Sequence, residues 1–397
     1  MATTSSVGET PHYPPKFSGI VSLNFSLIHR ISDVSSQQWD ALSSGHSLLS
    51  HTFLSALETP PNACPDTGWA PHHLIARNAE HLTGALPLYL KSHSRGEYVF
   101  DHGWANAYHQ HGLAYYPRLV SAIPFTPVSG PRLLSPDLST QHALIHQAID
   151  LSKANAISSL HILFPHTAQL PLLQEAGLLI REGVQFHWKN RGYRDYDDFL
   201  DCFRQKYRKK LRQDSRKVHE QGVEFTHHVA TDIDETLLLF FYQCYSNTYF
   251  IRGQRPYLSF AFFQELLQRM PEALLLIVAH QNSKPVACAL SVRSGSTLFG
   301  RYWGSVLDIP GLHFETCYIQ AIRWCIEQGI ECFEGGAQGE HKLARGLEPV
   351  TTYSAHWIAE PAFRQAIADF LQREREAVHH YKQELIEAMP FKADSTT

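Results

Sequence analysis

The order of strand-like and helix-like segments in the C-terminal third constrains the fold more than any other feature of the chain. Three strand-like segments follow one another through short polar turns, at 273–280, 285–293 and 298–305. A helix comes next, because apolar residues recur at helical spacing from Phe314 to Ile326 and Gly329 ends the pattern. A strand beginning at Cys332, a polar loop and a strand at 351–358 complete the series. This order predicts a mixed sheet with helices on both faces.

The N-terminal half repeats this order of elements more faintly. Its strand-like segments are 23–31, 74–76, 84–90, 118–124, 160–164 and 183–188. Its helix-like segments are 37–42, 49–57, 141–156 and 170–176. The second half adds a strand at 223–230 and helices at 197–221, after Asp232, after Leu258 and from Pro361. We therefore expect two copies of one α/β unit, at 21–190 and 191–397, behind a disordered lead-in at 1–20.

Composition excludes several classes of protein. The 397 residues are 44% hydrophobic and 18% charged, which is typical of soluble globular proteins of two or three domains. No run approaches the about 20 apolar residues of a membrane helix, and no signal pattern begins the chain, so a cytoplasmic location is expected. The formal net charge of -4 argues against wholesale nucleic-acid binding. The seven cysteines form no Cys-x-x-Cys pair, which favours buried thiols in a reducing compartment.

A long polar loop lies between the last two strand-like segments. Its polar side chains stand among glycines and are Glu334, Gln338, Glu340, His341, Lys342 and Arg345. A loop that only joined two strands would need about two to five residues. Glycines let a backbone approach a ligand closely. We therefore expect the loop to line a site that moves protons or holds anions, and a solvated surface loop is the alternative.

Three long segments resemble one family of proteins. They are GEYVFDHGWANAYHQHGLAYYPRLVSAIPFTPVSGPRLL (Gly96 to Leu134), HWKNRGYRDYDDFLDCFRQKYRKKLRQDSRKVHEQG (His187 to Gly222), and the stretch from RYWG through LHFETCYIQ to YSAHWI (Arg301 to Ile358). With the element order, they resemble a bacterial branch of the FemAB-like transferases, which attach amino acids to peptidoglycan precursors. The resemblance covers about Leu23 to Ile358. It implies an α/β fold with mixed sheets in two tandem GNAT-like domains, and the activity of an N-acyltransferase.

The resemblance leaves the donor open. GNAT enzymes that use acyl-CoA carry Arg/Gln-x-x-Gly-x-Gly/Ala before the helix that follows the fourth strand, where backbone N–H groups bind pyrophosphate. Here the corresponding segment reads VLDIPGLH, and Asp308 would repel a phosphate. This departure weakens acyl-CoA and leaves room for aminoacyl-tRNA, although Gly311 still precedes a helix start with free N–H groups. Gly311 and His313 are candidate contacts to such a co-substrate, and no tightly bound cofactor is expected.

A basic stretch on the helix expected at 197–221 bears on the donor too. Its basic residues are Arg204, Lys206, Arg208, Lys209, Lys210, Arg212, Arg216 and Lys217. One interpretation is a surface for a phosphate-rich partner, which is a tRNA acceptor stem, a nucleotide-sugar or a CoA tail, with Lys206, Lys209 and Lys210 as contacts. The other is a solvated helix face that complements its own dipole.

An aromatic segment follows Phe100 and lies between two expected strands. Its residues Asp101, Trp104 and Tyr108 suit the floor or lid of a pocket between the units, with rings for contact area and a carboxylate to orient an amine. A packing surface between the domains is the alternative.

Direct attack of an amine on an acyl donor needs a base, donors for the oxyanion and an acid for the leaving group. Glu334 and His341 are the candidate bases, since burial would raise the pKa of a carboxyl and histidine titrates near neutral pH. Tyr353 or Tyr302 is the candidate acid. The further residues expected to bind substrate or hold an anion are Arg301, Trp303, Glu340, Lys342, Arg345 and His356.

Other kinds of site have less support in the sequence. The residues that could surround a metal are His313, Glu315, His341 and His356, but no pair has HExxH spacing, and no metal is expected. Cys317 and Cys325 lie in the apolar stripe of a helix, which suits packing. The alternative function is a non-catalytic module that recognises a cell-wall precursor or peptide. For an enzyme, the expected acceptor is a small-molecule or peptide amine, and the oligomeric state is open.

Overall fold

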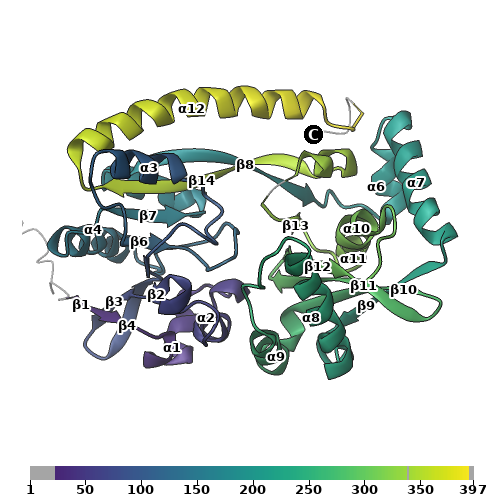
Figure 1. The fold of residues 1–397 in the computed structure, drawn as a ribbon, viewed down its shortest axis with the longest axis horizontal. Coiled ribbons are helices and arrows are strands. Elements are labelled where there is room, and N and C mark those ends of the chain that lie inside the picture. The colour runs from purple at the N-terminus through teal and green to yellow at the C-terminus, as the bar shows by residue number, and fades with distance from the viewer. Residues whose placement is uncertain (1–22, 338, 393–397) are drawn as a thin grey trace, which may run out of the picture.

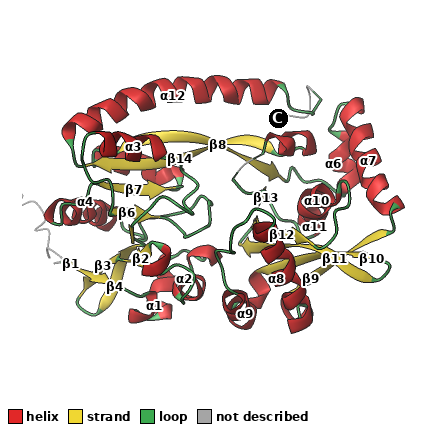
Figure 2. Cartoon of the chain, viewed as in Figure 1, coloured by secondary structure: helices red, strands yellow, loops and turns green. Residues whose placement is uncertain are grey.

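The computed structural model describes residues 23–337 and 339–392, and the expected lead-in at 1–20 lies outside them. A long mixed sheet runs through both halves of the molecule, with helices on both of its faces (Figure 1, Figure 2). The first half also contains a small antiparallel sheet of β1 (Asn24–Ile28), β3 (His73–Asn78) and β4 (His81–Leu86). In the described ranges, no helix is both long and apolar enough to cross a membrane.

The main sheet has the strand order β2-β5-β6-β7-β14-β8-β13-β12-β11-β10-β9. The first half contributes β2 (Trp69–Pro71), β5 (Tyr89–Lys91), β6 (Arg118–Ser121), β7 (Ser159–Leu163) and β8 (Leu179–Lys189). The second half contributes β9 (Val223–Val229), β10 (Leu274–Gln281), β11 (Lys284–Ser294), β12 (Thr297–Ser305), β13 (Cys332–Glu334) and β14 (Glu348–Ile358).

The helices of the first half lie between its strands, two of them between β1 and β2. They are α1 (Ser36–Leu42), α2 (His51–Glu58), α3 (His102–Gln110), α4 (Leu138–Ala154) and α5 (Leu170–Glu175). Those of the second half are α6 (Tyr196–Asp201), α7 (Gln205–Glu220), α8 (Glu235–Phe250), α9 (Phe260–Arg269), α10 (Leu312–Phe314), α11 (Gln320–Glu327) and α12 (Pro361–Glu387). The last of them runs along β8 and β14 (Figure 1).

The side chains of the strands in the second half point alternately to the two faces of the sheet and pack in two different hydrophobic cores. Along β10, Leu274, Leu276 and Val278 pack with α8 and α9 on one face. The residues between them, Leu275 and Ile277, pack with α6 and α11 on the other. Both sets are buried, as expected for a strand covered on both faces.

The two halves exchange their last strands. The strand β14 of the second half pairs with β7 and β8 of the first, both antiparallel. The strand β8 of the first half continues past β14 to pair with β13 of the second. The expected boundary near residue 190 therefore falls just after a strand that joins both halves into one sheet.

Four local expectations differ from the structure. The strand expected at 84–90 is two strands, because the chain leaves β4 of the small sheet at Leu86 and enters β5 of the main sheet at Tyr89. The helix expected at 197–221 is two helices, α6 and α7, because the chain turns at Phe203 and Arg204, where Arg204 N donates to Pro390 O. The aromatic segment expected as a loop is the helix α3. The helix expected to start at Phe314 has a π-helical segment, Glu315–Ile319, between α10 and α11. The remaining elements of the second half lie within a few residues of their expected places.

Candidate active site

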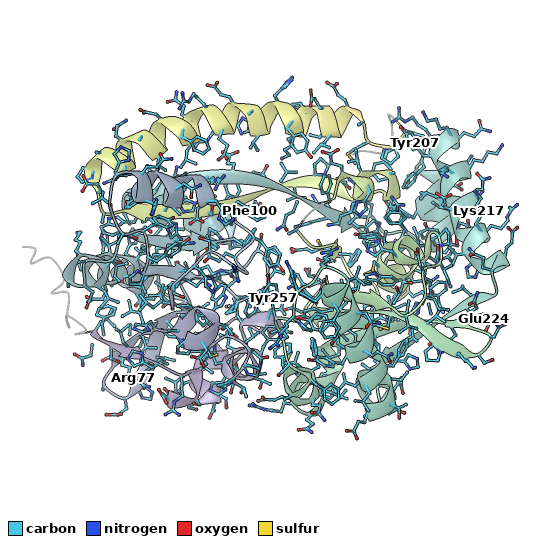
Figure 3. The ribbon with its side chains drawn as sticks, in the orientation of Figure 1. Arg77, Phe100, Tyr207, Lys217, Glu224 and Tyr257 are labelled. Atoms are coloured by element: carbon cyan, nitrogen blue, oxygen red, sulfur yellow. The ribbon has the colours of Figure 1, made fainter. Side chains whose placement is uncertain are left out.

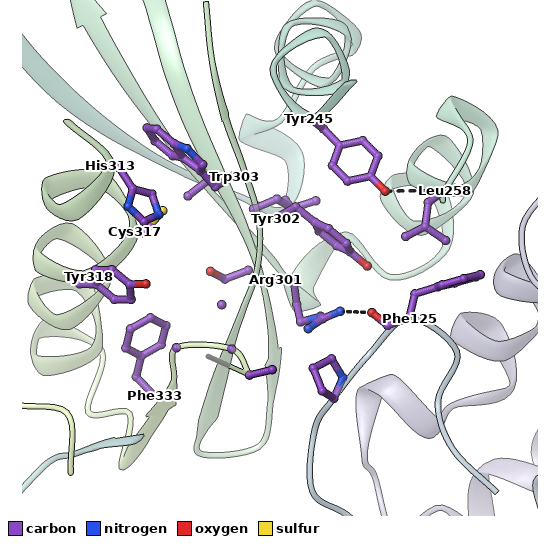
Figure 4. Close-up of a pocket in the computed structure, with 18 of the residues that line it drawn as sticks. Phe125, Tyr245, Leu258, Arg301, Tyr302, Trp303, His313, Cys317, Tyr318 and Phe333 are labelled. Atoms are coloured by element: carbon purple, nitrogen blue, oxygen red, sulfur yellow. Dashed lines mark hydrogen bonds between the residues drawn. The ribbon is translucent and has the colours of Figure 1, made fainter. Parts of the chain in front are cut away.

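The strands β12 and β13 diverge, and a cavity opens where they part. They pair in parallel only from Thr297 to Phe299 and from Cys332 to Glu334. Beyond that point lies a cavity of about 230 Å³ (Figure 4). Its walls come from α8, β11, β12, the helical segment after Gly311, the glycine loop after β13, and the first half through Tyr98 and Phe125.

A β-bulge in β12 sets the direction of Arg301. Tyr302 pairs with Leu290 and Gly300 with Ser291, so Arg301 is the extra residue. Bulges re-aim a side chain and recur beside active sites. Arg301 reaches across to the first half, where Nη2 donates to the backbone oxygen of Phe125 (Figure 4). Its Nε is buried and makes no hydrogen bond to any described residue, so one donor of the guanidinium is free.

Glu334 is the last paired residue of β13. Its neighbours Phe333 and Gly335 line the cavity, and Glu334 itself lies behind this wall rather than among the lining residues. Its carboxyl is buried, and Oε2 has no hydrogen-bond partner in the part of the chain that is described. Burial raises its pKa from 4.5 to about 8, against the opposing effects of the Arg301 and Arg132 guanidiniums. His187 Nδ1 lies 3.8 Å from Oε1, and burial lowers the pKa of this histidine to about 4, so it is neutral at pH 7. A carboxyl with these properties suits proton transfer near neutral pH.

Tyrosine side chains dominate the wall formed by α8 and β12. Tyr302 is buried with a hydroxyl that makes no hydrogen bond within the described ranges, and burial raises its pKa. Tyr245 and Tyr249 of α8 lie on the same side, and Tyr245 accepts a hydrogen bond from Leu258 N at 3.3 Å. Trp303, on the opposite face of β12, packs against His313 with ring centroids 5.1 Å apart. The gap between the strands therefore connects both faces of the sheet.

The π-helical segment supplies the facing wall. Such segments appear mostly at functional sites, because they shift side chains out of α-helical register. Here Cys317 and Tyr318 line the cavity, next to His313. Tyr318 OH lies 3.2 Å from His341 Nε2, and His341 is exposed to solvent. Burial and nearby cations lower the pKa values of His313, to about 4, and of His341, so both rings are neutral at pH 7.

The glycine loop holds its cations close to the backbone. Lys342 is buried, donates to Gly336 O at 2.7 Å, and has its pKa lowered to about 8 by burial. Arg345 stacks on Phe314, 3.6 Å from the ring centroid. Glu340 faces away from the cavity and accepts a hydrogen bond from Tyr381 of α12 at 2.7 Å.

A second hollow, of about 280 Å³, lies between α7 and the start of α10. Gly311, Lys217 and Arg345 line it together with two carboxylates, Asp214 and Glu315. The same Arg345 donates to His341 O, and His341 lies 3.2 Å from Tyr318 in the wall of the cavity, so the two hollows lie on either side of this loop.

The candidate lysines of α7 lie on the outer surface of the molecule. Lys206, Lys209 and Lys210 are exposed, and Lys210 pairs with Asp214 at 2.8 Å. Tyr207 and Lys217 mark the two ends of this helix in Figure 3. The expected basic residues of α7 are therefore exposed together on the surface, and acidic residues of α6 and α7 neutralise part of their charge.

Several expected site residues lie away from the cavity. Asp101 is buried in an ion pair with Arg118 at 2.8 Å, and Trp104 and Tyr108 pack against α12. His356 is buried against His161, Nδ1 to Nδ1 at 2.6 Å, and burial lowers its pKa well below 6.5. Tyr353 lines a separate hollow beside β8 and β14.

Sequence reasoning missed the aromatic side chains that close the cavity. Tyr318 and Cys317 belong to the apolar stripe of a helix and so indicate packing. Tyr245 and Tyr249 follow each other at i and i+4 on one face of α8, which indicates packing as well. Tyr98 and Phe125 come from the first half and reach the cavity only because the tertiary fold places them there, so no local sequence pattern could indicate them. Across the described residues, no group of three or more His, Cys, Asp or Glu side chains is placed to hold a metal.

Solved structures with this architecture are known. FemX is 12% identical, with a TM-score of 0.53 and coverage of 86% of this chain and 100% of that chain. L-PGS from Bacillus licheniformis is 10% identical, with a TM-score of 0.53 and coverage of 85% and 97%. The C-terminal domain of a putative lysylphosphatidylglycerol synthetase from Agrobacterium fabrum is 11% identical, with a TM-score of 0.52 and coverage of 84% and 95%. These likenesses show the fold, and the expected α/β fold with mixed sheets is confirmed.

Family comparison gives the same assignment from sequence. No curated protein has a sequence that matches this chain significantly. Residues 30–393 match the FemAB-like family model, which is described as peptidoglycan biosynthesis/recognition. Family and fold support a transferase of acyl or aminoacyl groups in general. Since the match covers nearly the whole sequence, the chain belongs to the FemAB-like family.

Proposed function

We propose that this protein is an N-acyltransferase that transfers an acyl or aminoacyl group to an amine by direct attack in the cavity between β12 and β13. The observation that carries the proposal is Glu334. Its carboxyl is buried at the point where the strands part, its pKa is raised to about 8, and Oε2 is unbonded within the described chain. A structural carboxyl at such a depth would normally be paired, because an unpaired buried charge is costly.

The proton steps balance without a covalent intermediate. The amine nitrogen attacks the acyl carbon of the donor and loses its proton to Glu334 through one water, because Glu334 lies next to the cavity wall and keeps 11% exposure. The free Nε of Arg301 and the Tyr302 hydroxyl donate to the oxyanion. As the bond to the leaving group breaks, Tyr318 supplies its proton. His341, hydrogen-bonded to Tyr318 and exposed, restores that proton from solvent.

The donor reaches the cavity from the side of α7 and α10. Lys217, Arg345 and the start of the helix at Gly311 offer positive charge there for the phosphate groups that both acyl-CoA and an aminoacyl-tRNA carry. Asp214 and Glu315 in the same hollow limit the charge it can attract. The arrangement supports a phosphate-bearing co-substrate, and the choice between the two donors is left to experiment.

Binding and turnover test the proposal together. The melting temperature of the purified protein would be compared with CoA, acetyl-CoA, longer acyl-CoAs and a stable aminoacyl-tRNA analogue. A ligand at about 100 times its Kd adds roughly 2.7 kcal/mol to the free energy of unfolding. Transfer from the donor that binds to a pool of primary amines would then be followed by mass spectrometry. We expect Glu334→Gln to keep the melting shift and to lose about 10² to 10⁴ in rate.

Matched variants separate catalysis from binding. Tyr318→Phe removes one hydroxyl and should lower the rate with little change in donor affinity, whereas Glu80→Gln, an exposed carboxyl in the turn between β3 and β4, should change neither. A protein that binds the donor but transfers nothing to any amine, with Glu334→Gln indistinguishable from the parent, would instead be a binding module.

A further inference from the structure

A groove leaves the cavity on the side of the first half. Tyr98 and Ala337 line both the cavity and a hollow of about 220 Å³ beside β8 and β14. Phe100 and Arg181 line both that hollow and a third one, of about 510 Å³, between α3 and α12. Shared walls therefore connect the three hollows in sequence. Phe100, which is labelled in Figure 3, lines the second and third of these hollows.

The far end of the groove is apolar. Trp104 and Ala107 of α3 face Phe363, Ile367 and Phe370 of α12. Phe370 is 41% exposed, and Phe100, between the two hollows, is 56% exposed. With the other aromatic and aliphatic side chains of the wall they form one exposed apolar patch.

The polar groups of this hollow are already bonded inside the protein. Arg181 makes two hydrogen bonds to the Glu374 carboxylate, at 2.8 and 2.7 Å, and one to Phe100 O. Asp101 accepts from Ser94 and Tyr115, and His111 Nδ1 lies 2.8 Å from Ala107 O. An apolar chain therefore fits the hollow better than a polar or charged ligand does.

We infer that the acceptor is an amine with an unbranched apolar tail, which lies between α3 and α12 while its nitrogen reaches the cavity. The inference rests on the proposed function. It assigns the groove to the acceptor because the donor approaches from the opposite side, through the hollow between α7 and α10. The hollow beside β8 and β14 holds the connecting part of the acceptor, where Glu182, Gln185 and Tyr353 offer polar contacts.

Binding of linear alkylamines tests the inference without turnover. Affinities of butylamine, hexylamine, octylamine and decylamine would be measured by calorimetry on the full chain. Each methylene that enters an apolar site should raise the affinity by roughly three- to fourfold. Ala366→Trp, on α12 in the wall of the hollow, should abolish this increase. Ala377→Trp, exposed on the same helix about three turns away, is the matched control and should retain it.

The possible results distinguish the apolar-tail site from a donor site and from failure of the proposed function. Affinity independent of chain length, or a length dependence that Ala366→Trp leaves intact, overturns the inference. A length dependence found only with acyl-CoAs assigns the groove to the donor and overturns it as well. Because Glu334→Gln should keep the length dependence, loss of transfer alone would count against the proposed function, whereas transfer to short amines without length dependence would count against the tail site alone.

Discussion

At the scale of the single residue, the Glu334 carboxyl links stability to pH. Its pKa is raised by burial from 4.5 to about 8 in the folded protein, so between these values the folded state holds a proton that the unfolded state has lost. Stability therefore falls as pH rises through this window. Glu334→Gln keeps the shape and removes the ionisation. At pH 9 we expect the variant to have a higher melting temperature than the parent, with a free energy of unfolding larger by on the order of a few kcal/mol. Near pH 4 the two proteins should melt at the same temperature.

Thermal melts at fixed ionic strength across pH 4 to 9 would check this. Glu80→Gln should melt with the parent throughout, because its carboxylate is exposed. If Glu334→Gln and the parent melted alike at pH 9, the carboxyl would be paired or solvated, and its candidacy as the base would end.

The sequence pointed to part of this site and could not point to the rest. Glu334 and Arg301 stood out because charged residues among glycines and aromatics rarely serve packing alone. Tyr318 did not, because its spacing satisfies the apolar stripe of a helix, and only the π-helical segment turns it into the cavity. The roles given to these residues stay predictions until the variants are measured.

At the scale of elements, the contact between α8 and β12 depends on the absence of a side chain at Gly304. A Cβ built there would lie 1.9 Å from Cys244 O and 2.1 Å from its carbonyl carbon, both in the backbone of α8. An added methyl group must move the helix, which costs typically about 1–3 kcal/mol or more. We expect Gly304→Ala to lower the urea midpoint and also to weaken donor binding, because α8 carries Tyr245 and Tyr249 into the cavity wall.

Gly103→Ala is the matched control, since a Cβ there meets no atom within 4 Å. It lies in α3, where alanine favours a helix by up to about 1 kcal/mol over glycine. A Gly304→Ala variant as stable as the parent would show that α8 shifts without cost, so this contact would not fix the cavity wall.

Periodicity predicted most elements of the second half, because their apolar residues alternate strictly or recur at helical spacing. It missed α3, whose sequence HGWANAYHQ carries a glycine and few strong helix formers. The one helical signal there is the four-residue spacing of Trp104 and Tyr108, which both pack towards α12. The bulge at Arg301 and the π-helical segment change register by a single residue, which no averaged pattern reveals.

At the scale of the whole molecule, the exchanged strands could not be read from the sequence. The repeat of elements indicated two units, and each unit appeared to own its last strand. Which strand pairs with β7 or β13 depends on the energies of alternative tertiary partners, and β8 and β14 satisfy both halves at once. Neither half has a complete sheet without the other. Because of the exchanged strands, the two halves should fold and unfold as one cooperative unit.

We therefore expect the described chain to unfold in a single transition. Leu160→Ala, in the core of the first half, and Ile322→Ala, in the core of the second, each remove a fully buried side chain and should cost about 2–5 kcal/mol. Each should shift the whole transition, whether it is followed by calorimetry or by hydrogen exchange in either half. The exposed Leu138, at 61% exposure, provides the control substitution Leu138→Ala, which should leave the midpoint in place.

Cooperativity of this kind has a specific physical source here. Opening the first half removes both partners of β14, which are β7 and β8. It also uncovers one edge of β13, because β8 is the strand that pairs with β13 on that side in the described sheet. The cavity lies at the opposite edge of β13, so unfolding of either half should also remove the proposed site. Two resolved transitions, each moved by only one of the core variants, would mean that the halves fold independently and that the exchanged strands add little to stability.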